Sequence, residues 1–239
     1  MTARTVDVNL GSLGSARLVD LSVDIRSGPH TLPPPAKSET RISQYRMDGA
    51  IHWQGSHITT TTHVGSHVDS PLHVAADGAV IGEIALDRLI GPAAVLDLTP
   101  VEPNQAIDGV VLAPFLDRIE PGHIAILRTD WTDRAWGTAA YWADSPFLTE
   151  DGAAALASRR PKAVAFDFFE ERCARYESFQ SEEFVVHLLL LKHHDILLIE
   201  NITNLSLLGS ERVVLFAAPL NIREAEGAPA RVFALEASS

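Results

Sequence analysis

Cysteine is almost absent from this chain. Cys173 is the single cysteine in 239 residues. One thiol cannot form an intramolecular disulfide, and it cannot supply a zinc site built from several cysteines. The sequence therefore excludes a disulfide-rich scaffold. A lone thiol also fits the reducing cytoplasm, which is where we expect the protein to work.

Positive charge and long apolar runs are also scarce. The chain has 19 Lys and Arg against 31 Asp and Glu, so its formal net charge is -12. An acidic surface repels phosphate backbones, and nucleic acid is not an expected partner. The longest apolar run is interrupted by His187 and Lys192 and is too short to span a bilayer. Residues 1–8 lead into no apolar signal segment, so we expect no membrane association.

Two common functional motifs are missing. The chain contains no G-x-S-x-G, which removes the usual nucleophile elbow of serine hydrolases. Residues 11–14 read G-S-L-G, but they lack the preceding strand and following helix of a dinucleotide-binding fingerprint. Neither a serine hydrolase nor a dinucleotide enzyme is expected.

The apolar patterning predicts a mixed α/β fold in one domain spanning residues 1–239. Strands are predicted at 17–25, 42–47, 51–62, 93–98, 124–128, 162–168, 196–199, 213–217 and 231–235. Helices are predicted at 114–119, 148–160 and 181–194, and the second is the best marked because Thr149 is a suitable N-cap and Pro161 ends it. The proline-rich segment 27–37 is predicted to be an extended arm or loop near the N-terminus.

Histidine is the informative residue. Residues 63–73 read H-V-G-S-H-V-D-S-P-L-H, and four side chains in this string can bind a metal. All four occupy odd positions: His63, His67, Asp69 and His73. Alternate residues of a strand face the same side, so these donors converge on one face of the chain.

A straight strand cannot bring these donors onto one metal. At roughly 3.3 Å per residue it holds His63 and His67 about 13 Å apart, whereas a metal binds its ligands at about 2.0–2.2 Å. We therefore expect a bend at Gly65 and Ser66, where glycine tolerates positive φ. Imidazole and carboxylate together suit zinc, manganese or iron. The alternative is a set of half-buried histidines satisfied within a polar loop.

His187 and Glu200 are a second pair of candidates. His187 lies inside the apolar run F-V-V-H-L-L-L-L, where an imidazole needs a polar partner. Glu200 follows the buried run 196–199, and the carboxyl end of a strand is a frequent site position. A core histidine and a solvated strand-end charge are the alternatives. With His63, His67 and Asp69, the pair makes five ligands, which suit two metals about 3.5–4 Å apart.

The string 63–73 resembles the cyclase-like metal-dependent hydrolases, whose pattern is H-x-G-T-H-x-D-x-P-x-H. Only Ser66, in place of threonine, departs from it. Residues 127–131 (L-R-T-D-W) resemble the family's strand ending in T-G-W, and 164–167 (V-A-F-D) resemble its G-x-D strand. His187 followed by 199–205 (I-E-N-I-T-N-L) resembles its H…E-N-x-x-N-L block. The family includes bacterial kynurenine formamidase and isatin hydrolase.

The resemblance implies a swivelling β/β/α fold and a metal site. By position it assigns His63, His67 and Asp69 as ligands, His187 and Glu200 as ligands of a second metal where one exists, and His73 as acid or base. Three departures bear on substrate rather than on metal. The formamidase segment W-P-G-D is replaced by residues 27–30, Asp130 stands where glycine is common, and 168–170 (F-F-E) follow Asp167.

These features predict a hydrolase that opens an amide, lactam or lactone of a small cyclic or aromatic carbonyl compound. One or two divalent metals per chain are expected, with zinc ahead of manganese. The alternatives are a metal-dependent cyclase or lyase and a non-catalytic metal-binding protein. His52, Trp53 and His57 precede the motif and are candidate substrate contacts, unless Trp53 belongs to the core. A homodimer or homotetramer is expected, with the proline-rich arm reaching a neighbour.

Overall fold

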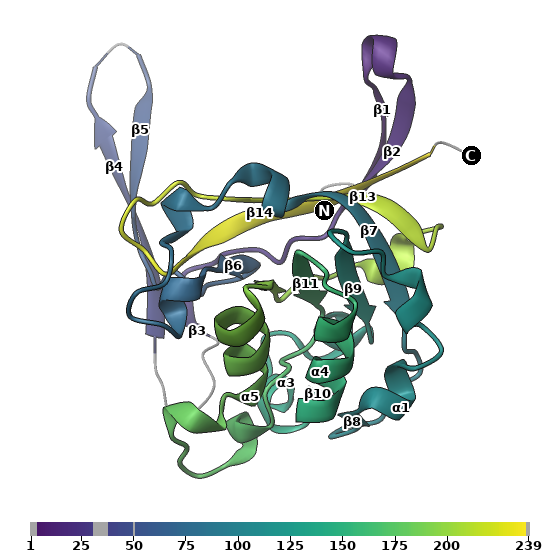
Figure 1. Cartoon of the computed structure of the whole chain (residues 1–239). Coiled ribbons are helices and arrows are strands. Elements are labelled where there is room, and N and C mark those ends of the chain that lie inside the picture. The colour runs from purple at the N-terminus through teal and green to yellow at the C-terminus, as the bar shows by residue number, and fades with distance from the viewer. Residues whose placement is uncertain (1–3, 31–37, 50, 238–239) are drawn as a thin grey trace.

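The framework of the protein is a nine-stranded sheet, seen in the computed structural model in Figure 1. The structure describes residues 4–30, 38–49 and 51–237. The strands of this sheet are β1 (Thr5–Asn9), β2 (Ser15–Asp20), β6 (His67–Asp69), β7 (Ile90–Asp97), β9 (Ile124–Arg128), β11 (Ala163–Phe166), β12 (Leu197–Glu200), β13 (Arg212–Pro219) and β14 (Gly227–Ala237).

The sheet closes on itself. Its order is β1-β2-β14-β13-β7-β9-β11-β12-β6, and β6 pairs with both β12 and β14. The strands β7, β9, β11 and β12 are parallel neighbours, and they are the apolar runs that predict fully buried strands. Their carboxyl ends therefore lie at one edge of the closed sheet, and β12 ends there at Glu200.

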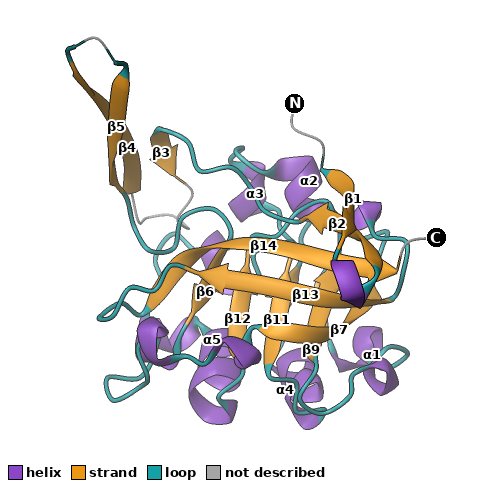
Figure 2. Cartoon of the chain, turned by 90° about the horizontal axis from the view of Figure 1, so that it is seen from above, coloured by secondary structure: helices purple, strands orange, loops and turns teal. Residues whose placement is uncertain are grey.

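In the described residues, five short α-helices flank the sheet: α1 (Gly109–Leu112), α2 (Trp131–Ala135), α3 (Ala140–Ala143), α4 (Glu150–Ser158) and α5 (Val185–His187). In Figure 2, α1, α4 and α5 lie along one side of the sheet, and α2 and α3 lie on the other. The helix predicted at 148–160 is confirmed as α4, and Thr149 caps it by accepting from the Gly152 amide at 3.2 Å. The two-residue strands β8 (Ala106–Ile107) and β10 (Phe147–Leu148) pair beside it.

The other two predicted helices differ from the expectation. Residues 114–119 contain only a 3-10 turn at Leu116–Arg118, because the helix here is α1, which begins earlier at its N-cap Asp108. Residues 181–194 form a helical segment in three pieces: a 3-10 turn at Ser181–Glu183, α5, and a π-helix at Leu188–His193. Strand β1, which pairs with β2, was not predicted, although its residues T-V-D-V-N alternate between polar and apolar.

A long hairpin projects from the body of the molecule in both views (Figures 1 and 2). It consists of β4 (Ser38–Met47) and β5 (Trp53–Thr59), and β3 (Gly28–His30) adds a third strand. Within the segment 27–37, predicted as an extended arm or loop, residues 28–30 pair with β4, while 31–37 lie outside the described residues. Within the described part of the chain, no helix has the length and apolarity to cross a membrane.

Candidate metal centre

The histidine motif bends where the sequence predicts. Gly65 has φ +62, and the single residue Ser66 leads from it into β6. The pairing of β6 with β12 places His67 opposite Glu200. Ser66 fixes the bend, because its hydroxyl donates to the Asn201 carbonyl oxygen at 2.7 Å and accepts from the Val23 amide at 3.0 Å. Serine thus keeps the hydroxyl that the family's threonine would supply.

Replacing Ser66 by alanine should lower the free energy of unfolding by about 1–3 kcal/mol, because the Val23 amide and the Asn201 carbonyl lose their partner. Ser66→Thr keeps the hydroxyl and is the matched control. Chemical denaturation of the three proteins measures the difference. An alanine variant as stable as the threonine variant would mean that water replaces the hydroxyl.

The structure brings together the six residues that the sequence selected as ligands and acid. His67 Nε2 lies 3.4 Å from Glu200 Oε2, and His187 Nε2 lies 3.2 Å from Glu200 Oε1. His187 Nε2 is also 3.5 Å from Asp69 Oδ2, and His63 Nδ1 is 2.8 Å from Asp69 Oδ1. Asp69 and Glu200 are thus the central carboxylates, with imidazoles on either side.

Glu170 and Glu171 also belong to the cluster, and neither was predicted from the sequence. Both side chains are fully buried, and Glu170 offers a carboxylate oxygen to the same space as His187 and Glu200. Burial raises the pKa of the Glu170 carboxyl well above its ordinary value, and the charge of Glu200 raises it further. The available signal was an acidic pair directly after the apolar run that contains β11.

The buried carboxylates are short of hydrogen-bond donors. Among the described residues, six oxygens of four acids have no donor aligned on them. They belong to Asp69, Glu170, Glu171 and Glu200. Buried anions without partners are costly unless they pair or bind a metal. The donor set therefore fits a divalent cation.

Three groups of side chains place one ligand atom each within 4.8 Å of one another. They are His63 with Asp69 and His73, His67 with Asp69 and Glu200, and Glu170 with His187 and Glu200. Asp69 and Glu200 each occur in two groups, and shared carboxylates are what a two-metal site uses as bridges.

Two of the histidines are oriented by groups that offer no ligand atom to the three metal-binding groups described above. His67 Nδ1 lies 3.0 Å from the Gly65 carbonyl oxygen, to which it donates when Nδ1 is protonated, and this leaves Nε2 facing the carboxylates. His187 Nδ1 lies 2.9 Å from Glu171 Oε1, which also accepts from the His187 amide at 2.9 Å. Such partners fix the ring orientation of a metal-binding histidine.

Glu171→Gln should therefore weaken metal binding by about 10–100-fold without removing a ligand atom. The side-chain oxygen of the glutamine can still accept from the backbone amide of His187. It would hold the His187 imidazole without a negative charge. Metal titration against a competing chelator measures the change, and the exposed Glu177→Gln is the control. An unaltered affinity would mean that the packing around His187 orients its ring without help from Glu171.

His63 and His73 lie at the outer side of the cluster, with ring centroids 4.3 Å apart. Burial disfavours protonation of His63, but Asp69 and Glu226 outweigh it and raise the pKa of His63 to about 10. Both ring nitrogens of His63 have carboxylate partners, since Nε2 lies 3.0 Å from Glu226 Oε1. Desolvation of the His73 ring lowers the pKa of that side chain. The roles of the two as ligand and acid stay predictions.

His52, Trp53 and His57 are not brought to the cluster of their own chain. They lie at the projecting hairpin, and Trp53 is 62% exposed, so it is not a core residue. Asp167, another residue of the family pattern, binds the turn after β9 through the Thr129 and Asp130 amides. Burial raises the pKa of Asp167 to about 7. Asp130 has φ +57, the conformation that explains glycine at this position elsewhere in the family.

A cavity of about 530 Å³ borders the cluster. The metal-binding candidate His187 and the neighbouring His73 lie in its wall, together with the apolar side chains of Leu72, Phe184 and Leu188. A cavity with an apolar lining and a few convergent polar groups is the usual form of a small-molecule site. This cavity is the candidate substrate site.

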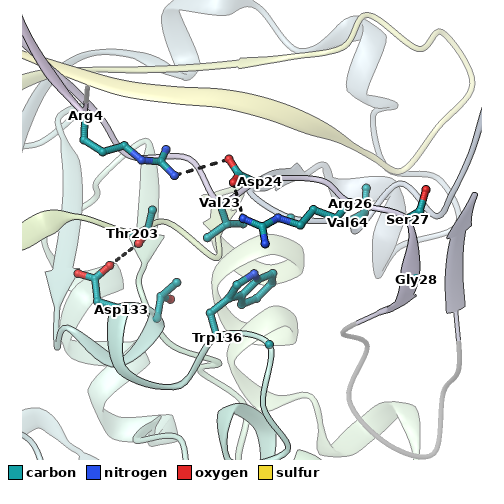
Figure 3. Close-up of a pocket in the computed structure, with 13 residues that line it drawn as sticks. Arg4, Val23, Asp24, Arg26, Ser27, Gly28, Val64, Asp133, Trp136 and Thr203 are labelled. Atoms are coloured by element: carbon teal, nitrogen blue, oxygen red, sulfur yellow. Dashed lines mark hydrogen bonds and ion pairs between the residues drawn. The ribbon is translucent and has the colours of Figure 1, made fainter. Parts of the chain in front are cut away.

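A second cavity, of about 490 Å³, lies beside the Gly65 turn (Figure 3). In it Asp24 pairs with Arg26 at 2.8 Å and with Arg4 at 3.6 Å. The Thr203 hydroxyl donates to Asp133. These polar groups pair with one another and none belongs to the metal-binding groups, so the cavity beside His187 is the stronger candidate for the substrate site.

A closed α/β sheet with a buried histidine–carboxylate centre defines a metal-binding protein, and comparison with known proteins gives its family. Residues 19–170 match the family described as "Putative cyclase". Because the match covers more than half of the chain, the protein belongs to this family, as residues 63–73 predict.

Solved structures share the fold. A potential metal-dependent hydrolase with cyclase activity has 25% sequence identity and a TM-score of 0.70, with 94% of this chain and 100% of that chain covered. A predicted metal-dependent hydrolase from Bacillus stearothermophilus has 25% identity and a TM-score of 0.70, covering 92% and 98%. Isatin hydrolase A from Labrenzia aggregata, bound to benzyl benzoate, has 23% identity and a TM-score of 0.76, covering 93% and 94%. The expected mixed α/β fold is confirmed.

Proposed function

We propose that the protein is a metal-dependent hydrolase that opens an amide, lactam or lactone bond in a small cyclic or aromatic carbonyl compound. The observation that carries the proposal is the buried centre of carboxylates without donors, bordered through His73 and His187 by a cavity of about 530 Å³ with a partly apolar wall. The metal-dependent hydrolases that share the fold support the same reaction class.

One or two metals would be held by His63, His67, Asp69, His187 and Glu200, with Glu170 as an additional ligand. A divalent metal there would supply hydroxide at neutral pH and polarise the substrate carbonyl. The apolar walls formed by Leu72 and Phe184 exclude water from the ring of the substrate. His73 lines the cavity, and its lowered pKa keeps its ring neutral at neutral pH, so it can accept a proton and return it to the leaving group.

We further propose zinc as the metal, with manganese as the alternative, at one or two ions per chain. Zinc ranks above manganese in intrinsic affinity for nitrogen and oxygen ligands. The carboxylate-rich set suits manganese as well, so metal availability decides between them.

The test is metal analysis of the purified protein combined with a panel of amides, lactams and lactones. We expect a stoichiometric divalent metal, hydrolysis of at least one member, and loss of activity on chelation that added metal restores. An active preparation without stoichiometric transition metal would contradict the proposal. Dehydration or ring closure in place of hydrolysis would favour the cyclase or lyase alternative. A closed tetrahedral site with no activity would favour a metal-binding protein without catalysis.

The projecting hairpin supports a homodimer or homotetramer, which we also propose. Tyr45, Met47, Trp53 and His57 lie on one face of it, since Met47 pairs with Trp53 and Tyr45 with Gly55. β3 pairs only with residues 38–40, so the rest of the hairpin has two strands. A two-stranded hairpin is at best marginally stable in water, so its apolar face needs a cover. A second copy of the chain is the proposed cover, and there His52, Trp53 and His57 would meet the neighbour's substrate cavity.

Light scattering tests this assembly. We expect an oligomer for the natural chain, and dissociation for Trp53→Glu, which charges the exposed apolar face. Arg46→Glu is the control, because Arg46 pairs with Gln54 and so lies on the opposite face of the same hairpin. A monomeric natural protein would contradict the proposal.

We place the protein in the cytoplasm, on the ground that Cys173 is its single cysteine and is buried and unpaired.

A further inference from the structure

We propose that Lys192 recognises an anionic group of the substrate, so that the compound hydrolysed carries a carboxylate or similar anion in addition to the bond that is cleaved. This inference rests on the proposed function, because it assigns the substrate class of the same cavity. It is carried by the π-helix that follows the metal-binding candidate His187.

The π-helix changes which side chains share a face with His187. In an α-helix, residues three and four apart lie on one face, and that rule would place Leu190 and Leu191 beside His187. In a π-helix, hydrogen bonds join residues five apart, which aligns His187 with Lys192 and Leu188 with His193. All four of the latter side chains line the cavity, while Leu190 and Leu191 are buried. The π-helix therefore places the side chain of Lys192 in the wall of the cavity that borders the metal-binding cluster.

Lys192 has no competing partner. Its side chain is exposed, and no hydrogen bond or ion pair joins it to any residue in the described part of the chain. Lys162 is different, because its ammonium donates to the carbonyl oxygens of Asp87 and Ile90 and so serves the fold. An ammonium without a partner at the wall of a cavity is available to a ligand carboxylate.

The other groups of the cavity define the shape of that ligand. Leu72, Phe184 and Leu188 give an apolar wall that suits a ring. One helical turn separates His187 from Lys192, so a ring held at the metal centre comes within reach of the lysine side chain. The cavity wall carries both signs of charge, because Glu182 lines it as well as Lys192. The negative charge of Glu182 repels an anion. Replacing Glu182 should therefore strengthen the binding that Lys192 provides.

The experiment compares benzoate with isophthalate and terephthalate as ligands of the metal-loaded protein. Benzoate has one carboxylate for the metal, and the other two carry a second one on the same ring. We expect the better dicarboxylate to bind about fivefold to twentyfold more tightly than benzoate, the range of a charge-assisted hydrogen bond at a partly solvated site. Calorimetric titration measures the dissociation constants.

Four variants separate the lysine from general charge effects. Lys192→Met should abolish the preference for the dicarboxylate, Lys192→Arg should keep it, and Glu182→Gln should enlarge it. Arg223→Met removes one exposed positive charge outside the cavity and should leave the preference unchanged. A preference below twofold in the natural protein, or one that survives Lys192→Met, would overturn the assignment.

Failure of this inference is distinguishable from failure of the proposed function. A protein that takes up no metal contradicts the proposed function. A protein that binds metal and benzoate but does not discriminate the second carboxylate contradicts only the role of Lys192.

Discussion

Glu200→Gln should remove stoichiometric metal while leaving the fold intact. Glu200 is shared by two of the three groups that could hold an ion, and it touches both His67 and His187. An amide oxygen is uncharged and a poorer metal donor than a carboxylate. We expect the metal affinity to fall by more than about 100-fold, beyond the loss typical of a residue that only orients a ligand.

Metal content after dialysis, measured beside circular dichroism, tests this expectation. Glu211→Gln is the matched control, because Glu211 is exposed, pairs with Arg118 and belongs to none of the metal-binding groups. Glu170→Gln should behave like Glu200→Gln if Glu170 is a ligand as the structure places it. Unchanged metal content in the Glu200 variant would place that residue outside the centre and make it a strand-end charge.

The metal-binding string was predictable because its chemistry leaves few geometries. The spacing of His63 and His67 cannot serve one metal in a straight strand, and Gly65 is the residue that permits a bend. The string also predicts the family. The string does not show that β12 lies beside β6, since the pairing of His67 with Glu200 depends on how the sheet closes.

The two buried glutamates escaped prediction for a physical reason. Adjacent residues of a strand face opposite sides, so a strand pattern never places Glu170 and Glu171 in one site. The chain leaves β11 at Phe166, and the irregular segment that follows lets both carboxylates reach the region around His187. Local periodicity carries no information about such a segment.

Two further elements show where sequence patterns stop. The apolar spacing of 181–194 predicts a helix, but it does not distinguish α from π, and that difference decides whether Lys192 or Leu191 shares a face with His187. The alternation in β4 and β5 predicts strands, but it does not show that their apolar face looks outward. Whether Trp53 is exposed depends on what covers the hairpin. The sequence of the hairpin alone does not specify that cover.

His73→Ala should keep the metal and slow turnover by about 10²–10⁴-fold, the usual contribution of a positioned proton carrier. His73 lines the cavity beside His63 and His187, with ring centroids 4.3 Å and 5.5 Å away. Its lowered pKa leaves the ring neutral at neutral pH and able to accept a proton. The ligand set of Asp69 and Glu200 with the other histidines is complete without it.

Metal content distinguishes a proton carrier from a metal ligand. The alternative of a ligand arises because a His73 nitrogen lies within 4.8 Å of donor atoms of His63 and Asp69. His67→Ala should lose metal and activity together, whereas His73→Ala should lose activity alone. The exposed His194→Ala, which removes an imidazole away from the cavity, should change neither. If His73→Ala empties the centre, His73 is a ligand and another group carries the proton. If it keeps full activity, the proton carrier lies elsewhere, and His52 and His57 on a neighbouring subunit's hairpin become the candidates to replace next.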